Sequence, residues 1–223
     1  MNQTTLLPQG APLADPNSGP RNPEPREFDP RAAEILASVR QTFSEKGFDG
    51  ASMQDLAKAA GMSVGNFYRY FSSKAGIVAA IIESDLCEVE RDFAQVLASD
   101  QPFVRLKALV REQLPQHSAN KDSDLWAEIS VVARRHSEIG AAALRMEARI
   151  RAALHSVIAR QTGLPLPDVA RRFAAEADFI LLLFKASSCS GDAYSSHQDR
   201  LNDLIIASID QTLDSISQTT RNS

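Results

Sequence analysis

The chain has 223 residues, of which 43% are hydrophobic and 23% charged, a composition that suits a globular protein of one large or two small domains. Its net charge of -4 argues against a polybasic coat for nucleic acid and against a binder of anionic membranes, so contact with an anionic partner must be local. The longest apolar run, FILLLF at residues 179–184, is too short to span a bilayer, and the N-terminus lacks the pattern of a secretory signal. We therefore expect a cytoplasmic protein with no membrane partner.

The N-terminal segment differs in composition from the rest of the chain. Residues 1–29 hold six of the eleven prolines, together with Asn, Gln, Ser and Gly, and show no hydrophobic periodicity. We predict a disordered arm over residues 1–28. The only two cysteines, Cys87 and Cys189, lack the spacing of a metal, redox or haem site, so we expect buried reduced thiols, no metal and no cofactor.

The first ordered element begins at Asp29, a natural N-cap, followed by Pro30, which suits the first helical position. Apolar residues recur at Ile35, Val39 and Phe43, which indicates one helical stripe facing a core. Gly47 can end this helix in a backbone conformation with positive φ.

Three further helices follow at short intervals. Ser52 and Asp55 have the spacing of a capping box and open a short helix that Gly61 ends. Ser63 caps a helix predicted from residue 64 to about residue 71, and Ser72 or Ser73 caps a long helix that starts at residue 74 and runs into the nineties.

The same helical pattern continues to the end of the chain. Helices are predicted to start at Asp100, Asp122, Ser137, Pro167 and His197, and no segment alternates with period two over the length of a strand. This gives nine helices and no sheet. The fold class is therefore all-α, with an N-terminal three-helix domain over residues 29–76, a C-terminal helical bundle over 77–217 and a disordered tail over 218–223.

Two short helices joined by a glycine turn form a helix-turn-helix, whose second helix can lie in the major groove of DNA. Ala57 lets the two helices approach closely, and Phe67 returns a ring to the core beneath them. At 100° per residue, Val64, Phe67 and Phe71 fall on one face of the second helix. The opposite face is polar and rich in hydrogen-bond donors.

The charge distribution agrees with such a contact. Residues 56–82 contain Lys58, Arg69 and Lys74 but none of the 28 acidic residues of the chain, so a positive field is expected where the helix would meet DNA. The N-terminal arm either has no role or touches DNA through Arg21 and Arg26, and both readings remain open.

Within the helix-turn-helix at residues 52–71, we assign Asn66 and Arg69 to base edges, because Asn pairs bidentately with adenine and Arg with guanine. Phosphate contacts that fix register are assigned to hydroxyl and ammonium groups. The complete predicted DNA-binding set is Ser52, Ser63, Val64, Gly65, Asn66, Tyr68, Arg69, Tyr70 and Lys74.

Spacing alone also allows a plain αα-hairpin inside a helical bundle, with Tyr68 and Tyr70 as half-buried core rings. Residues 31–78, about a fifth of the chain, closely resemble the DNA-binding domain of the TetR (tetracycline repressor) family. This resemblance argues against the plain hairpin. The motifs that carry the resemblance are E-x-G-F after the first helix, A-x-x-A-G-M-S-x-G at the turn, F-Y-x-Y-F on the second helix and the following S-x-K.

The resemblance implies a bacterial homodimer of nine-helix subunits that represses transcription at a palindromic operator and is released by a small molecule. It also implies phosphate contacts by Tyr68 and Lys74 and base contacts by residues 64–66. The chain departs from the family at Val64, where many members carry Lys or Arg, and Arg69 can supply that charge instead.

The last two predicted helices carry more apolar residues than one small bundle needs, so we predict that they pair with their symmetry mates in a four-helix dimer interface. The alternative is that both helices are intramolecular core. The predicted interface comprises Phe173, Ala177, Ile180, Leu181, Phe184, Leu201, Leu204, Ile205, Ile209 and Leu213.

An effector pocket is predicted between the middle helices, with His117, Glu128 or Arg134 orienting the ligand. Its predicted lining is Phe93, Phe103, Trp126, Ile129, Met146 and Phe179. A closed cavity beside Trp126 would support a small-molecule effector, whereas a filled bundle favours a DNA-binding dimer regulated through a protein partner. No G-x-S-x-G, phosphate-loop or H-E-x-x-H motif is present, so we do not expect an enzyme.

Overall fold

The computed structural model describes residues 30–119, 122–188 and 196–221, and within these ranges the chain is helical with no strand. The predicted arm at residues 1–28 and Cys189 lie outside the described residues. The helices are α1 (Pro30–Gly50), α2 (Met53–Ala59), α3 (Val64–Phe67), α4 (Lys74–Ala98), α5 (Pro102–Ala119), α6 (Asp122–Val132), α7 (Ser137–Thr162), α8 (Leu166–Arg172), α9 (Ala174–Ser188) and α10 (Gln198–Arg221).

The prediction of an all-α fold is confirmed, but the described residues form ten helices rather than nine. The single helix expected from Pro167 is divided at Phe173, whose backbone leaves helical geometry at φ −120° and ψ 24°. The ring of Phe173 is buried in the core at this point. A turn that directs this ring inward therefore separates α8 from α9.

Several local signals act as the sequence predicted. Ser52 and Asp55 form a capping box, and the hydroxyls of Ser63 and Ser73 accept hydrogen bonds from backbone N–H groups in the first turns of α3 and α4. Gly47 and Gly61 adopt positive φ values of 68° and 65°, which a residue with a Cβ rarely adopts. These groups fix where α1 to α4 begin and turn.

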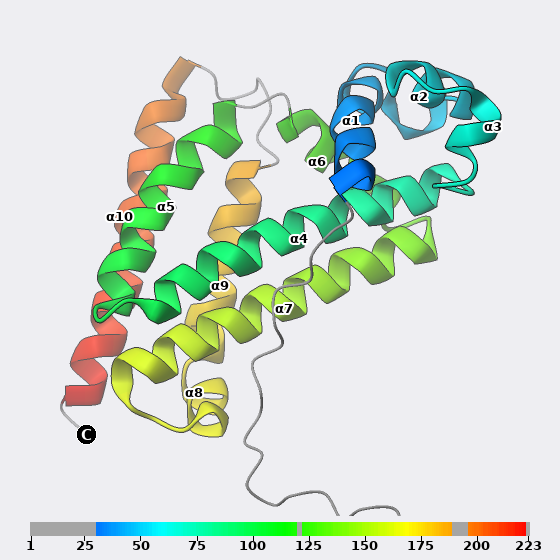
Figure 1. Ribbon diagram of the computed structural model, residues 1–223. Coiled ribbons are helices and arrows are strands. Elements are labelled where there is room, and N and C mark those ends of the chain that lie inside the picture. Colours follow the sequence, from blue (N-terminus) through cyan, green and yellow to red (C-terminus); the bar gives the residue numbers. More distant parts are fainter. Residues whose placement is uncertain (1–29, 120–121, 189–195, 222–223) are drawn as a thin grey trace, which may run out of the picture.

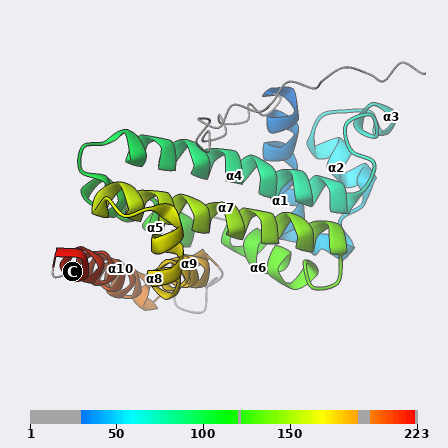
Figure 2. The same ribbon diagram turned by 90° about the horizontal axis from the view of Figure 1, so that it is seen from below.

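The helices α1 to α3 form one end of the molecule, and α4 leads from them into the rest of the chain beside the long helix α7 (Figures 1 and 2). At the far end, α5 and α10 lie side by side, next to α9. The first residue of α4 therefore belongs to the helix-turn-helix end, while its last turns belong to the opposite end.

Two hydrophobic clusters fill the protein. The first combines buried residues of α1, α2, α3 and the start of α4 with Leu125, Ile129 and Val132 of α6 and Ile139 and Ala142 of α7. The second lies between the end of α4 and helices α5, α7, α8, α9 and α10. The cluster beneath the helix-turn-helix is thus completed by residues about 50 to 90 positions further along the chain.

The first hydrophobic cluster crosses the predicted limit between the two domains. The limit between residues 76 and 77 falls inside the first turn of α4, and the first cluster crosses it, because the N-terminal helices alone do not cover their own apolar faces. At the other end, α10 continues to Arg221, so the predicted tail is helical from residue 218 to 221.

Candidate nucleic-acid interface

The capping box at the start of α2 is a compact polar unit. The Ser52 hydroxyl accepts a hydrogen bond of 3.1 Å from the backbone N–H of Asp55, whose carboxylate accepts from the Ser52 backbone N–H at 3.0 Å. The Lys46 ammonium lies 2.6 Å from the other carboxylate oxygen. Hydrogen bonds from Lys46 and then from Ser52 hold the pKa of Asp55 well below its ordinary value of 3.8.

Because the folded-state pKa of Asp55 is depressed, its carboxylate stabilises the fold fully above that ordinary value, and the contribution is lost as pH falls through the folded-state pKa. At neutral pH the only acidic residue of α2 is thus already paired with a lysine. The negative charge that it would otherwise present beside the recognition helix is compensated.

We expect Ser52→Ala to lower the free energy of unfolding by about 1 kcal/mol, the usual cost of removing an N-cap hydroxyl. Urea unfolding followed by circular dichroism would measure the loss. Ser156→Ala is the matched control, since its hydroxyl only bonds the Ala152 carbonyl within α7 and its removal should change stability by less than about 0.5 kcal/mol. Equal effects of the two substitutions would contradict the role of the cap.

The helix α3 packs against α2 through one ring. Phe67 is fully buried and lies 5.9 Å from the ring of Phe71, measured between centroids. The sequence placed Val64 on this inner face, but its side chain is 36% exposed. Val64 is the first residue of α3. Regular helix ends at Phe67 and continues as turns, not to about residue 71 as predicted, and only the Phe67 ring is directed fully inward.

The outer face of α3 and the following turn presents a continuous exposed surface. It consists of Ser63, Val64, Gly65, Asn66, Tyr68, Arg69 and Tyr70. Tyr68 and Tyr70 are 50% and 43% exposed, so the reading of these rings as core residues is wrong. We call this set the outer α3 face.

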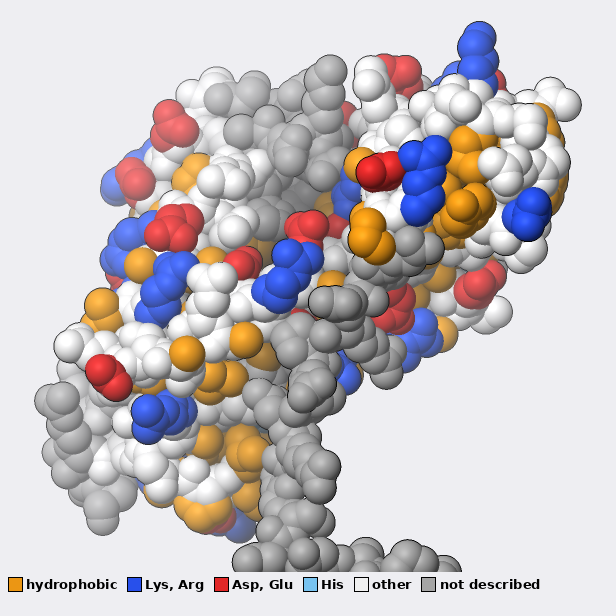
Figure 3. Space-filling model, in the orientation of Figure 1, with side chains coloured by type: hydrophobic (Ala, Val, Ile, Leu, Met, Phe, Trp, Pro, Cys, Tyr) orange, Lys and Arg blue, Asp and Glu red, His pale blue; other side chains and the backbone are white. Residues whose placement is uncertain are grey.

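Apart from the Ser63 hydroxyl, which caps α3, the polar side chains of the outer α3 face have no partner in the described part of the protein. Among the described residues, the side chains of Asn66, Tyr68, Arg69 and Tyr70 have no hydrogen-bond or ion-pair partner. Lys and Arg side chains stand out at this end of the molecule in the view of Figure 3. A surface of exposed donors, in a stretch of sequence from residue 56 to 82 without Asp or Glu, is suited to an anionic partner.

Lys74 differs from the other predicted contacts. Its ammonium donates to the carbonyl oxygens of Phe48 at 2.6 Å and Asp49 at 3.2 Å, and its side chain is half-buried. An ammonium has three donors, so one remains for a phosphate. The structure thus gives Lys74 a second partner that the sequence did not predict.

The predicted effector pocket is not formed by the residues assigned to it. Ile129, Trp126 and Met146 belong to the first hydrophobic cluster, whereas Phe93 and Phe103 belong to the second, so they do not line one cavity. Phe179 is 43% exposed because it lies on the outer side of α9. Arg134 is exposed, and the side chain of His117 lies outside the described residues.

The interior beside α6 is filled. A gap between Phe43, Phe48, Leu125 and Ile129 has no room for a water molecule. A surface groove of about 200 Å³ lies between α4 and α7, and it is crossed by ion pairs from Arg145 to Glu83 and from Arg149 to Glu90. Neither space is the closed apolar cavity that the sequence predicted.

The predicted dimer interface also needs correction at the level of residues. Most of its members already serve the core of a single chain, because α9 and α10 direct their main apolar stripes inward. The buried members are Phe173, Ala177, Ile180, Leu181, Ile205, Ile209 and Leu213. Leu204, which belongs to the predicted interface, is exposed, and α9 also exposes Phe179 and Leu182, which were not assigned to the interface.

Residues 35–81 match the family model described as bacterial regulatory proteins, tetR family. Residues 35–81 therefore form a TetR-type DNA-binding domain. The chain is 37% identical over 79 residues to the uncharacterized HTH-type transcriptional regulator YvdT of Bacillus subtilis, a match that covers 35% of this chain and 41% of YvdT. The chain spans less than half the length of the curated relatives that it matches.

Solved structures resemble this fold over most of the chain. A transcriptional regulator from Rhodococcus sp. Rha1 is 21% identical, with a TM-score of 0.65 over 84% of this chain and 96% of that one. FadR of Bacillus subtilis, crystallised with stearoyl-CoA, is 14% identical, with a TM-score of 0.60 over 83% and 97%. TetR-family members are transcription regulators rather than enzymes, in agreement with the sequence prediction.

The sequence alone did not show the contact between Glu128 and the end of α1. The Glu128 carboxylate accepts a hydrogen bond of 2.8 Å from the backbone N–H of Phe48, 80 positions away. The sequence indicated only that a helix ends at Gly47, and it gave no sign that Glu128 would contact this end.

In the described part of the chain, no helix is both long and apolar enough to cross a membrane.

Proposed function

We propose that the chain is a DNA-binding transcriptional repressor that binds a palindromic operator as a homodimer. The observation that carries this proposal is the outer α3 face, where donors from four neighbouring side chains are exposed and without partners in the described protein. A helix presented in this way fits the major groove, and the TetR-type sequence at residues 35–81 supports the same docking.

Arg69→Ala should weaken binding to the operator by roughly 1 to 3 kcal/mol while changing binding to random DNA little, because the guanidinium is assigned to a base edge. Lys74→Ala should weaken binding to all sequences alike and reduce the salt slope by about one unit. Titrations at several salt concentrations, on a duplex selected from a random pool and on a scrambled duplex, would measure both. Equal losses for Arg69→Ala on the two duplexes would contradict its base-reading role.

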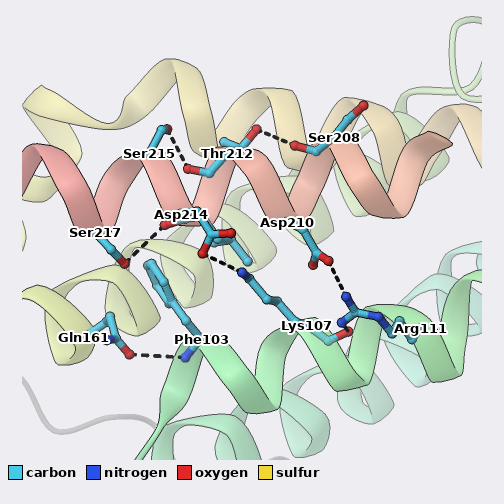
Figure 4. Close-up of polar contacts among 11 residues, drawn as sticks. Phe103, Lys107, Arg111, Gln161, Ser208, Asp210, Thr212, Asp214, Ser215 and Ser217 are labelled. Carbon is cyan, nitrogen blue, oxygen red and sulfur yellow. Dashed lines mark hydrogen bonds and ion pairs between the residues drawn. The ribbon is translucent and has the colours of Figure 1, made fainter. Parts of the chain in front are cut away.

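The proposed dimer uses the outer sides of α9 and α10. Phe179 and Leu182 lie on one side of α9, and Leu204 is exposed on α10. Ser208 and Ser215 follow Leu204 along α10, and their hydroxyls donate to carbonyl oxygens of the same helix at 2.8 Å. Figure 4 shows Asp210 and Asp214 directed toward Arg111 and Lys107 of α5, with Ser208 and Ser215 on the other side of α10. A side with satisfied hydroxyls can be covered by a second chain without leaving donors unpaired.

The response to a signal is proposed for the C-terminal half. FadR of Bacillus subtilis has this fold and was crystallised with stearoyl-CoA, which supports release by a small-molecule effector. The gap beside Leu125 and Ile129, which has no room for a water molecule, supports the alternative, a dimer regulated through a protein partner. Native mass spectrometry of the dimer purified from its host would decide, because a co-purifying small molecule supports the first version and a co-purifying protein the second.

A further inference from the structure

The end of α1 is held by a side chain from the C-terminal half. Gly47 leaves helical geometry at φ 68° and ψ 173°, so the following N–H group, that of Phe48, does not continue the helix. That N–H donates to Oε1 of Glu128, on α6, at 2.8 Å. A carboxylate thus caps a backbone donor that would otherwise be unpaired and buried beside a core ring.

The same short segment is held from its other side by the start of α4. The Lys74 ammonium donates to the carbonyl oxygens of Phe48 and Asp49 and lies 4.9 Å from the centroid of the Phe48 ring. We call residues 47–49 the α1 turn. Glu128 accepts a hydrogen bond from its Phe48 N–H group, and Lys74 donates to its Phe48 and Asp49 carbonyl oxygens.

The α1 turn has little freedom to shift between these two groups. The Phe48 side chain is 5% exposed, and its ring lies 4.7 Å from the His136 ring and 6.3 Å from the Phe43 ring, between centroids. A Cβ added at Gly47 would come within 3.2 Å of Glu128 Oε1. The close fit means that a displacement of α6 is passed to the turn rather than absorbed by a gap.

We infer that Glu128 is a positioning residue for DNA binding, which links α6 through the α1 turn to Lys74 at the start of α4. This role rests on the proposed function. Lys74 lies four residues after Tyr70, the last residue of the outer α3 face. The α1 turn therefore sets where its remaining donor and the first turn of α4 stand relative to a phosphate.

Two substitutions of Glu128 with the same charge change separate the hydrogen bond from electrostatics. Glu128→Gln retains an oxygen acceptor for the Phe48 N–H, whereas Glu128→Ala does not, and both remove one negative charge. We expect Glu128→Ala to bind the operator roughly tenfold more weakly than Glu128→Gln, within the usual range of coupling between sites. The probe is the duplex that the wild-type chain enriches from a random-sequence pool, at a temperature where all variants are fully folded.

Further variants and a direct probe exclude a merely structural effect. Asp124→Ala removes an exposed carboxylate from the same helix and should leave affinity unchanged, and Val157→Ala weakens the second hydrophobic cluster without touching the α1 turn. Hydrogen exchange at the Phe48 amide should be faster in Glu128→Ala than in Glu128→Gln. Equal operator affinities of the two Glu128 variants, or a loss in Val157→Ala as large as in Glu128→Ala, would overturn the inference.

The binding data distinguish a failure of the proposed DNA-binding function from a failure of the role of Glu128. If the wild-type chain enriches no duplex from the pool, the proposed function is wrong and the positioning role falls with it. If the wild type binds but both Glu128 variants bind equally well, only the role of Glu128 is overturned.

Discussion

Gly65→Ala should make the protein more stable and yet a poorer DNA binder. Gly65 lies in α3 with a negative φ, and a Cβ built there meets no other atom within 4 Å. Glycine inside a helix is less favourable than alanine by roughly 0.5 to 1 kcal/mol, so the substitution should raise the melting temperature by about 1 to 4 °C. Nothing within the described protein requires this position to lack a side chain.

The proposed function explains glycine at this position, because the backbone of α3 would approach a base edge of the DNA closely there. A methyl group there should weaken operator binding by roughly 10- to 100-fold, comparable to a mismatched base pair. Differential scanning fluorimetry and fluorescence anisotropy on the selected duplex would measure the two opposite effects.

The matched control is Gly50→Ala, at the end of α1, where the nearest atom to an added methyl is Cβ of Lys46 at the ordinary distance of 3.8 Å. The proposal places no DNA there, so operator affinity should be unchanged. If Gly65→Ala binds as tightly as the wild type, the N-terminal half of α3 does not face the bases.

Leu182→Glu should convert the proposed dimer into a folded monomer. The side chain is 61% exposed in the single chain, so the substitution costs the fold little, but two buried carboxylates facing each other across a two-fold axis are strongly unfavourable. Losing the second half-site should reduce operator affinity by roughly 100-fold or more. Sedimentation velocity and the same binding titration would follow both changes.

Leu144→Glu provides the comparison, because Leu144 of α7 is 69% exposed and lies outside the proposed interface. It carries the same change in size and charge and should leave both assembly and DNA binding unchanged. A Leu182→Glu chain that still sediments as a dimer would contradict an interface on the outer side of α9.

The local parts of the structure were predictable because their signals lie within a few residues of each other. The capping serines, the positive-φ glycines and the buried ring of Phe67 all follow from short-range spacing. The division at Phe173 did not, since it depends on where a ring finds space in a core assembled from several helices. The exposure of Val64, the first residue of α3, likewise did not follow from the helical period.

The C-terminal half was harder to predict for a physical reason. A helix with a dense apolar stripe can bury it within its own chain or against a second chain, and hydrophobic periodicity is the same in both cases. The stripe on α10 that includes Ile209 and Leu213 is used within the chain. Periodicity also cannot tell a packed core from a cavity, so residues assigned to one pocket are in fact divided between two clusters.

The hydrophobic cluster beneath the helix-turn-helix has a consequence for engineering. A fragment ending at Ala98 would keep α1 to α4 but lose Leu125, Ile129 and Val132, and the apolar faces that they cover would be opened to water. We therefore expect that α1 to α4 do not fold stably without the rest of the chain. A chimera that transplants these helices into another regulator has to carry α6 and the first turns of α7 as well, or redesign the side chains that replace them.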